Sequence, residues 1–283
     1  MEASSSPCSS PGYFGEPGDS RETVELLGHR VRLVDLSRPL KSTLSEPTPP
    51  RINRISHQDT AQMWEFMFDI PPTALPLGLG FAGEIVEAST HASTHLDAPW
   101  HYAPTSEGEP AWTIDEIPLQ WFVGKAVVLD VSDLPTGYLV TDKDIEERLN
   151  SLGHVIAAGE IVLFRTGADA VWGSEEFFNY GCGLGEEAVL YLVDKGVRVI
   201  GTDAWSLDRP YPLIGNEWMT LQESRRLWPA HFAGIKRRYS QIEKLTNLEA
   251  LPPLGSTILC FPIKIEGGSG AWSRVIGLIP ETI

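Results

Sequence analysis

Short apolar segments separated by Gly, Pro and polar residues recur along the chain from about residue 30. Segments of this kind, rich in Val, Ile and Leu, are typical of β-strands. They predict strands at 31–36, 63–70, 83–88, 126–131, 160–165, 197–202, 257–265 and 272–279. Because strands occur toward both ends of the chain, a mixed sheet is favoured over a purely parallel one.

Two segments have a helical pattern instead. Thr141 and Asp144 form a start resembling a capping box for a helix in "TDKDIEERLNSLG". In "GEEAVLYLVDKG" (185–196) the apolar residues share one helical face, and the final glycine is a stop signal. The order strand, helix, strand through residues 126–202 indicates an α/β fold.

The chain shows no internal repeat and no strong linker, so we expect one domain over residues 26–283. Residues 1–25 are rich in Ser, Pro and Gly and are predicted to be a disordered leader. This leader lacks the basic start and apolar core of a secretory signal.

Composition limits the function classes. A formal net charge of −16 repels phosphate backbones, so nucleic acid is not an expected partner. No run of about 18 apolar residues is present, so no membrane span is expected. Cys8, Cys182 and Cys260 form no CxxC pair and are expected to be reduced thiols of a cytoplasmic protein. A small-molecule substrate is the expected partner.

Three of the seven histidines lie in "STHASTHLDAPWHY" (89–102), together with an aspartate. A helix would place His91 and His95 on one face but would direct Asp97 away from them, and Pro99 opposes a helix. In a strand, His95 and Asp97 share a face. A straight strand, however, would place the two histidines about 13 Å apart.

Convergence of these side chains on one ion therefore requires a bend, and the small Ala92 and Ser93 permit it. Two neutral imidazoles and a carboxylate suit Zn²⁺, Mn²⁺ or Fe²⁺ with positions left open for water. The alternative is a solvent-facing strand whose histidines are incidental.

This segment resembles the motif H-x-G-T-H-x-D-x-P-x-H of the metal-dependent cyclase family, which includes kynurenine formamidases, isatin hydrolase and some polyketide cyclases. Residues 91–101 read "HASTHLDAPWH", with Ser93 where the family usually has glycine. The resemblance continues through "GTDAWSLDRP" to "FPIKIEGGSGAWSRVIGLIP" and covers most of the chain. It implies a compact α/β domain of the swivelling β/β/α type, with a mixed, barrel-like sheet flanked by helices, assembled as a homodimer or homotetramer.

The resemblance also implies a metal site for one or two divalent ions, Zn or Mn. The residues that match the family's ligands are His91, His95, Asp97, His231 and Glu243. His101 matches a position that acts as general base or acid, and a role as a further ligand is the alternative. Without the resemblance, Glu243 would be taken for a solvated charge.

Three other residues are weaker candidates for a substrate pocket. Asp203 and Trp205 follow a predicted strand, at the end where α/β sheets place ligands. Asp203 either orients a ligand histidine or caps a loop. Trp100 and Trp205 are either walls of an apolar pocket or part of the core.

The resulting hypothesis is a metal-dependent hydrolase that attacks an amide, formamide, cyclic amide or lactone carbonyl with metal-activated water. One alternative is a polyketide-type cyclase that uses the same site for an intramolecular aldol ring closure. Another is a binding protein that has kept the fold without the activity. The intact set of six metal-site and proton-transfer residues argues against the last.

Overall fold

The computed structural model describes residues 23–281. Most of the predicted leader therefore lies outside the described residues. Its predicted end at residue 25 is wrong, because Thr23–Leu26 form strand β1, which pairs with β2 (His29–Asp35). No helix in the described part of the chain is long and apolar enough to cross a membrane.

Ten of the described strands form one mixed sheet. Its order is β1, β2, β16 (Ile276–Pro280), β14 (Leu254–Leu259), β8 (Val123–Asp130), β10 (Ile161–Arg165), β12 (Val199–Thr202), β13 (Ser240–Glu243), β5 (His95–Asp97) and β15 (Gly270–Trp272). The four strands β8, β10, β12 and β13 are parallel, and the outer ones are antiparallel. A mixed sheet is therefore confirmed.

The sheet curls so that its two sides approach each other. The amide of Ser273, just after β15, donates to the carbonyl of Thr94, and the amide of Leu36, just after β2, donates to the carbonyl of Val275. The segment between β15 and β16 therefore bonds to both sides of the sheet. This connection gives the sheet the barrel-like form that was expected.

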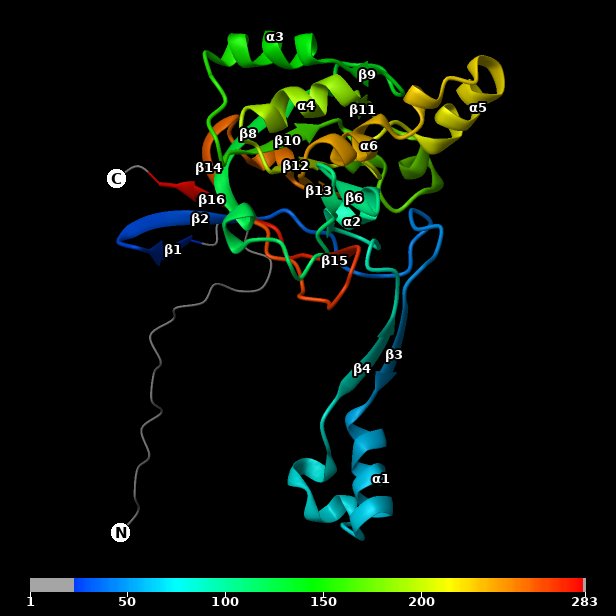
Figure 1. The fold of residues 1–283 in the computed structure, drawn as a ribbon. Coiled ribbons are helices and arrows are strands. Elements are labelled where there is room, and N and C mark those ends of the chain that lie inside the picture. Colours follow the sequence, from blue (N-terminus) through cyan, green and yellow to red (C-terminus); the bar gives the residue numbers. More distant parts are fainter. Residues whose placement is uncertain (1–22, 282–283) are drawn as a thin grey trace.

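Both faces of the parallel strands are buried. Val127 and Phe164 belong to a hydrophobic cluster beneath the helices, whereas Val128 and Leu163 belong to a second cluster on the opposite face. The near-continuous apolar sequences of these strands follow from this double burial. Helices α3 (Asp142–Leu152), α4 (Glu186–Asp194) and α6 (Pro229–Lys236) cover the first face (Figure 1).

The remaining elements lie outside the ten-stranded sheet and the three helices that cover it. Helices α2 (Pro99–Tyr102) and α5 (Tyr211–Leu221) flank α6, and β9 (Leu139–Val140) pairs with β11 (Gly183–Leu184), as β6 (Thr105–Ser106) does with β7 (Glu109–Pro110). Single 3-10 turns occupy Pro72–Ala74, Pro76–Gly78, Leu119–Phe122, Ala168–Val171, Glu175–Asn179, Ser224–Arg226 and Leu248–Ala250.

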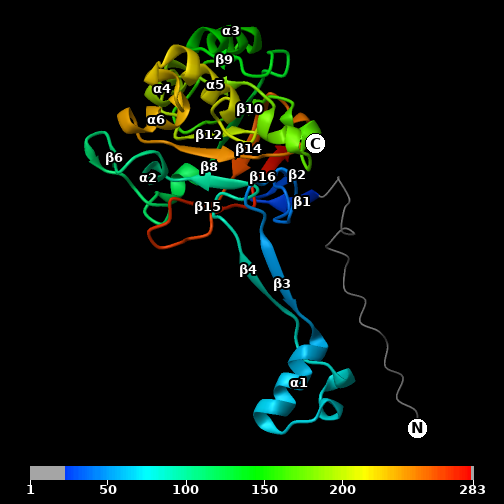
Figure 2. The ribbon, with the colours of Figure 1, turned by 90° about the vertical axis from the view of Figure 1, so that its right-hand side faces the viewer.

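Residues 51–87 form a separate projection, which we call the arm. Strands β3 (Arg51–Ile55) and β4 (Gly83–Glu87) pair as a two-stranded ribbon that carries helix α1 (His57–Phe68) at its tip. Two perpendicular views show the arm extending away from the sheet (Figures 1 and 2).

Three predicted strands differ from the structure. The strand predicted at 63–70 is wrong, because Ser56 and Asp59 form a capping box that starts helix α1 instead. The strand predicted at 257–265 ends at Leu259, and 272–279 is two strands separated at 273–275. Both predicted helices are confirmed, with Thr141 as the cap of α3 and Gly196 at a φ of +96° just after α4.

Candidate metal centre and active site

A bend after His91 turns the motif segment back on itself. Ser93 has a φ of +58°, in the left-handed region that favours glycine, and strand β5 starts two residues later at His95. The predicted bend at Ala92 and Ser93 is therefore confirmed. It brings the Nδ1 atom of His91 to 2.7 Å from Oδ1 of Asp97.

Serine is held in this glycine-like conformation by hydrogen bonds. Its amide donates to the Glu46 carboxylate at 2.7 Å, and its hydroxyl donates to the backbone carbonyls of Arg38 at 3.0 Å and Pro39 at 3.3 Å. A glycine could not make the hydroxyl contacts. Ser93 therefore offsets the strain of a positive φ with contacts that the family's usual residue lacks.

We expect Ser93→Ala to be less stable than Ser93→Gly. Both variants lose the hydroxyl bond, which leaves a buried carbonyl without its donor and costs about 1–3 kcal/mol. Glycine recovers about 1–2 kcal/mol because it adopts a positive φ without strain. Urea unfolding of the two variants and the parent measures the difference, and equal stability of the two variants would contradict this account.

The pairing of β5 with β13 assembles the next part of the site. In this antiparallel register Asp97 lies opposite Gln241, and His95 lies opposite Glu243. Because alternate residues of a strand share a face, all four side chains project to the same side of the sheet. The sequence distance between the motif segment and Glu243 is therefore bridged by one pair of neighbouring strands.

His95 has a buried ring nitrogen that lacks a hydrogen-bond partner. Its Nδ1 atom lies 2.8 Å from the carbonyl oxygen of Ser93, so Nδ1 carries the proton and Nε2 presents a lone pair. That Nε2 atom makes no hydrogen bond, although it lies 3.2 Å from Oδ1 of Asp97 and 3.6 Å from Oε2 of Glu243. A buried nitrogen lone pair without a donor thus lies close to two carboxylate oxygens, which fits a divalent cation.

The two carboxylates have opposite pKa shifts. Burial raises the pKa of Glu243, and the nearby Asp97 charge adds to the increase. Burial also favours a raised value for Asp97, but the surrounding histidines outweigh it and hold the pKa of this carboxyl well below its usual range. Crowded negative charge of this kind is relieved by a bound cation.

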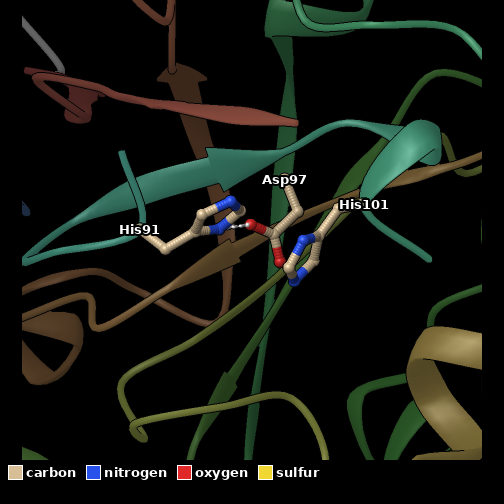
Figure 3. A group of neighbouring side chains, drawn as sticks. All are labelled: His91, Asp97 and His101. Carbon is tan, nitrogen blue, oxygen red and sulfur yellow. Dashed lines mark hydrogen bonds and ion pairs between the residues drawn. The ribbon is translucent and has the colours of Figure 1, made fainter. Parts of the chain in front are cut away.

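His101 lies on α2, and its ring stacks on that of His91 with centroids 4.1 Å apart. Burial lowers the pKa of His101 to about 4; Asp97 opposes the shift, while His91 and His231 reinforce it. Ligand atoms of His91, Asp97 and His101 lie within 4.8 Å of one another (Figure 3). This geometry suits either a third metal ligand or a base beside the metal.

His231 enters the site from the first turn of α6, where Asp208 fixes its orientation. The Asp208 carboxylate accepts hydrogen bonds from the backbone amides of Ala230 and His231 and lies 2.5 Å from Nδ1 of His231. Burial alone would lower the pKa of His231, but the Asp208 hydrogen bond raises it to about 9. The Nε2 atom then faces Asp97 at 3.8 Å and Glu243 at 3.9 Å.

Gln241 lies at the centre of these groups. Its side-chain amide donates to Asp97 at 2.9 Å and lies 2.8 Å from Nε2 of His231, and it is 3.3 Å from Glu243. Sequence reasoning missed both Gln241 and Asp208. Gln241 could have been found because it stands two residues before Glu243 and so shares its face of the strand.

The weaker candidates have different surroundings. All the side-chain hydrogen bonds of Asp203 are accepted from Thr166 and Gly167, so it caps a loop and orients no histidine. Asp208 has the orienting role instead. Trp100 is 48% exposed beside His101.

Trp205 belongs to an aromatic row next to the site. Its ring contacts Tyr211, with centroids 5.0 Å apart, and Tyr211 contacts Trp228 at 5.7 Å. The loop that carries Trp205 reaches the site directly, because the amide of Leu207 donates to Glu243. An apolar wall therefore borders the carboxylates on this side.

The structure thus brings together all six residues that the motif and the resemblance indicate. Ligand atoms form two overlapping groups, His91–Asp97–His101 and His95–Asp97–Glu243, which share Asp97. The set of imidazoles and carboxylates matches the preferences of Zn²⁺ and Mn²⁺. Which of these residues bind an ion, and how many ions bind, stay predictions.

Known proteins share similarity with most of this chain. Isatin hydrolase of Roseibium aggregatum is 27% identical over 216 residues, which cover 71% of this chain and 76% of that protein. Kynurenine formamidase of Salinibacter ruber is 30% identical over 190 residues, which cover 66% of this chain and 76% of that protein. A crystal structure of an isatin hydrolase bound to the product analogue thioisatinate superposes with a TM-score of 0.69 at 25% identity, over 89% of this chain and 93% of that one.

A family-level comparison extends beyond these individual relatives. The profile of the family described as "Putative cyclase" matches residues 34–209, which include the whole motif segment and the loop that carries Trp205 and Asp208. The match spans more than half of the chain. The protein therefore belongs to the Cyclase family.

Proposed function

We propose that this protein hydrolyses the C–N bond of an amide attached to or fused with an aromatic ring, with the help of a divalent metal. The observation that carries the proposal is the buried Nε2 lone pair of His95, which makes no hydrogen bond and faces the carboxylates of Asp97 and Glu243. Relatives named isatin hydrolase and kynurenine formamidase support the reaction class. Cyclisation of a polyketide is not favoured, because those relatives are hydrolases.

His91, His95, Asp97, His231 and Glu243 are the residues that would hold the metal, Zn or Mn. When bound, such an ion acidifies water and polarises the substrate carbonyl. Nδ1 of His95 donates to the Ser93 carbonyl and Nδ1 of His231 donates to the Asp208 carboxylate, so these two rings direct Nε2 to the site. Orientation of the rings is thus set by the protein before any ligand arrives.

His101 is proposed to transfer the proton. Its ring stacks on that of His91, and its exposed side chain can reach both water and the leaving group. It takes a proton from the attacking water as the carbon–oxygen bond forms. It then returns that proton to the nitrogen as the C–N bond breaks, so that an amine and a carboxylic acid are released.

The aromatic row of Trp205, Tyr211 and Trp228 is proposed to bind the flat part of the substrate. These rings lie edge to face beside the carboxylates, an arrangement that offers apolar contact next to the reacting carbonyl. Trp100 would contact the substrate from the side of His101.

The protein as purified is expected to contain Zn or Mn and to hydrolyse N-formylkynurenine or isatin. Chelation should abolish the activity, and restoring the ion should recover it, because the site otherwise lacks its positive charge. Elemental analysis and absorbance assays measure both. If the protein hydrolyses neither compound after the metal is restored, the proposed substrate class is wrong.

His101→Gln separates proton transfer from metal binding. The variant should keep its metal content while kcat falls about 10²–10⁴-fold, the usual contribution of general acid–base catalysis. His154→Gln is a matched control, since His154 pairs with Glu160 away from the site. Loss of metal from the His101 variant would instead make His101 a ligand.

A further inference from the structure

Two buried histidines of the site differ in the partner of their inner nitrogen. His95 and His231 each carry a proton on Nδ1, so each presents the lone pair of Nε2 to the carboxylates. The Nε2 atom of His95 makes no hydrogen bond. That of His231 lies 2.8 Å from the side-chain nitrogen of Gln241, which has hydrogens to donate and no lone pair to bind an ion. One of the two lone pairs therefore lacks a partner, and the other already has one.

The amide of Gln241 fills the space between His231 and the two carboxylates. Its nitrogen lies 2.9 Å from Oδ2 of Asp97 and 3.3 Å from Oε1 of Glu243. These are the same two oxygens that face Nε2 of His231, at 3.8 and 3.9 Å. The two hydrogens of the amide thus bring partial positive charge to a group of acceptors that would otherwise repel one another.

Packing holds Gln241 in this position. Its side chain is fully buried, and its Oε1 atom accepts a hydrogen bond from the Tyr239 hydroxyl at 3.1 Å. Tyr239 is itself buried and stacked on Tyr102, with ring centroids 5.1 Å apart. The backbone of Gln241 pairs with Ile200 on one side and with Asp97 on the other. Both ends of the amide therefore have fixed partners, and turning the amide over would bring its oxygen against the Asp97 carboxylate.

The groups of ligand atoms that lie closest together do not include His231. Within the described residues, these groups are His91–Asp97–His101 and His95–Asp97–Glu243. His91 can still offer a lone pair to an ion, because the Ser269 hydroxyl, 2.9 Å from its Nε2 atom, can accept a hydrogen bond as well as donate one. The amide nitrogen of Gln241 cannot change role in this way. The arrangement favours an ion on the side of His91 and His95 alone.

We propose that Gln241 closes the position beside His231, so that the site binds one divalent ion per chain and not two. The inference rests on the proposed metal-dependent function and narrows it. Of the five residues proposed to hold the metal, His231 is the one that keeps the Gln241 amide as its partner. Gln241 is thus a positioning residue that determines the number of ions, and a carboxylate or a small side chain in its place would admit a second ion.

The number of ions bound by the full chain tests this proposal. Equilibrium dialysis of the chelated protein against Mn²⁺, followed by elemental analysis, should give one ion per chain for the parent and two for Gln241→Glu and Gln241→Ala. Glutamate has nearly the same shape but donates no hydrogen bond when ionised, and alanine removes the amide. Gln62→Glu adds the same charge at an exposed position on α1 and should bind one ion, as the parent does.

The electron paramagnetic resonance spectrum of bound Mn²⁺ gives a second readout that does not depend on activity. Two ions in one site lie about 3.5–4 Å apart, so their unpaired electrons couple. Both Gln241 variants should show a coupled spectrum, whereas the parent should show that of an isolated ion.

Two coupled ions in the parent would overturn the proposal and leave the metal-dependent function intact. A single ion in both Gln241 variants would overturn it as well, because another feature would then limit the number of ions. If a variant does not fold, the ion count of the parent still decides. A parent that binds no ion would overturn the proposed function, and this inference with it.

Discussion

Asparagine in place of Asp97 is expected to abolish tight binding of divalent metal and with it the activity. Asp97 is fully buried and belongs to both groups of ligand atoms, so its charge serves the whole site. Asparagine keeps the shape and can still bond to His91, which limits the effect on folding. Substitution of a residue that hydrogen-bonds to a metal ligand typically weakens metal affinity about 10–100-fold. Loss of the Asp97 charge should therefore weaken metal binding by at least about 100-fold.

Calorimetric titration with Mn²⁺ or Zn²⁺ measures this affinity, and thermal unfolding gives a second measure. Metal should raise the melting temperature of the parent, because a ligand that binds only the folded state stabilises it, and should leave that of Asp97→Asn unchanged. Asp194→Asn removes the same charge from an exposed ion pair with Arg237 and should behave as the parent does. A variant that binds metal as the parent does would exclude Asp97 as a shared ligand.

Much of the fold is predictable from the sequence because the parallel strands are buried on both faces. Their continuous apolar runs and the two capped helices are local signals, and these predictions are confirmed. The error at 63–70 has a physical cause. Exposed apolar residues on the arm look like a buried strand, and only the capping box of Ser56 and Asp59 indicates the helix.

The site was predictable where the motif is contiguous. The alternation of His95 and Asp97 and the need for a bend at Ser93 follow from strand geometry alone. Asp208 and Gln241 were missed because their roles depend on tertiary packing. Asp208 acts through the position of α6, and Gln241 through the register of β13 on β5.

The largest effect on stability is expected from Lys244→Met. Lys244 is buried, and its ammonium group donates to the Glu46 carboxylate at 2.8 and 3.1 Å and to the carbonyl of His91 at 2.9 Å. Glu46 in turn accepts the amide of Ser93. The ion pair therefore holds the backbone of His91 and Ser93, on both sides of the bend that directs His91 toward Asp97.

Methionine has a similar length but no charge, so the variant leaves Glu46 buried and unpaired. Loss of one partner of a buried pair costs about 3–5 kcal/mol of unfolding free energy. The exposed pair of Lys236 and Glu186, with a nitrogen–oxygen distance of 2.7 Å, is a matched control. Lys236→Met should change stability by no more than about 1 kcal/mol, because water already screens that pair.

The double variant Glu46→Gln/Lys244→Met separates the cost of an unpaired buried charge from the loss of the hydrogen bond to His91. Removal of both charges avoids the unpaired carboxylate, so the double variant should be more stable than Lys244→Met alone. Its metal affinity should stay below that of the parent, because the carbonyl of His91 still lacks its donor. Urea unfolding gives the free energy of unfolding, and metal titration gives the metal affinity. Both are measured for the parent, Lys244→Met, Lys236→Met and the double variant. If Lys244→Met were no more destabilising than Lys236→Met, the bend would be held by Ser93 and its hydrogen bonds without the ion pair.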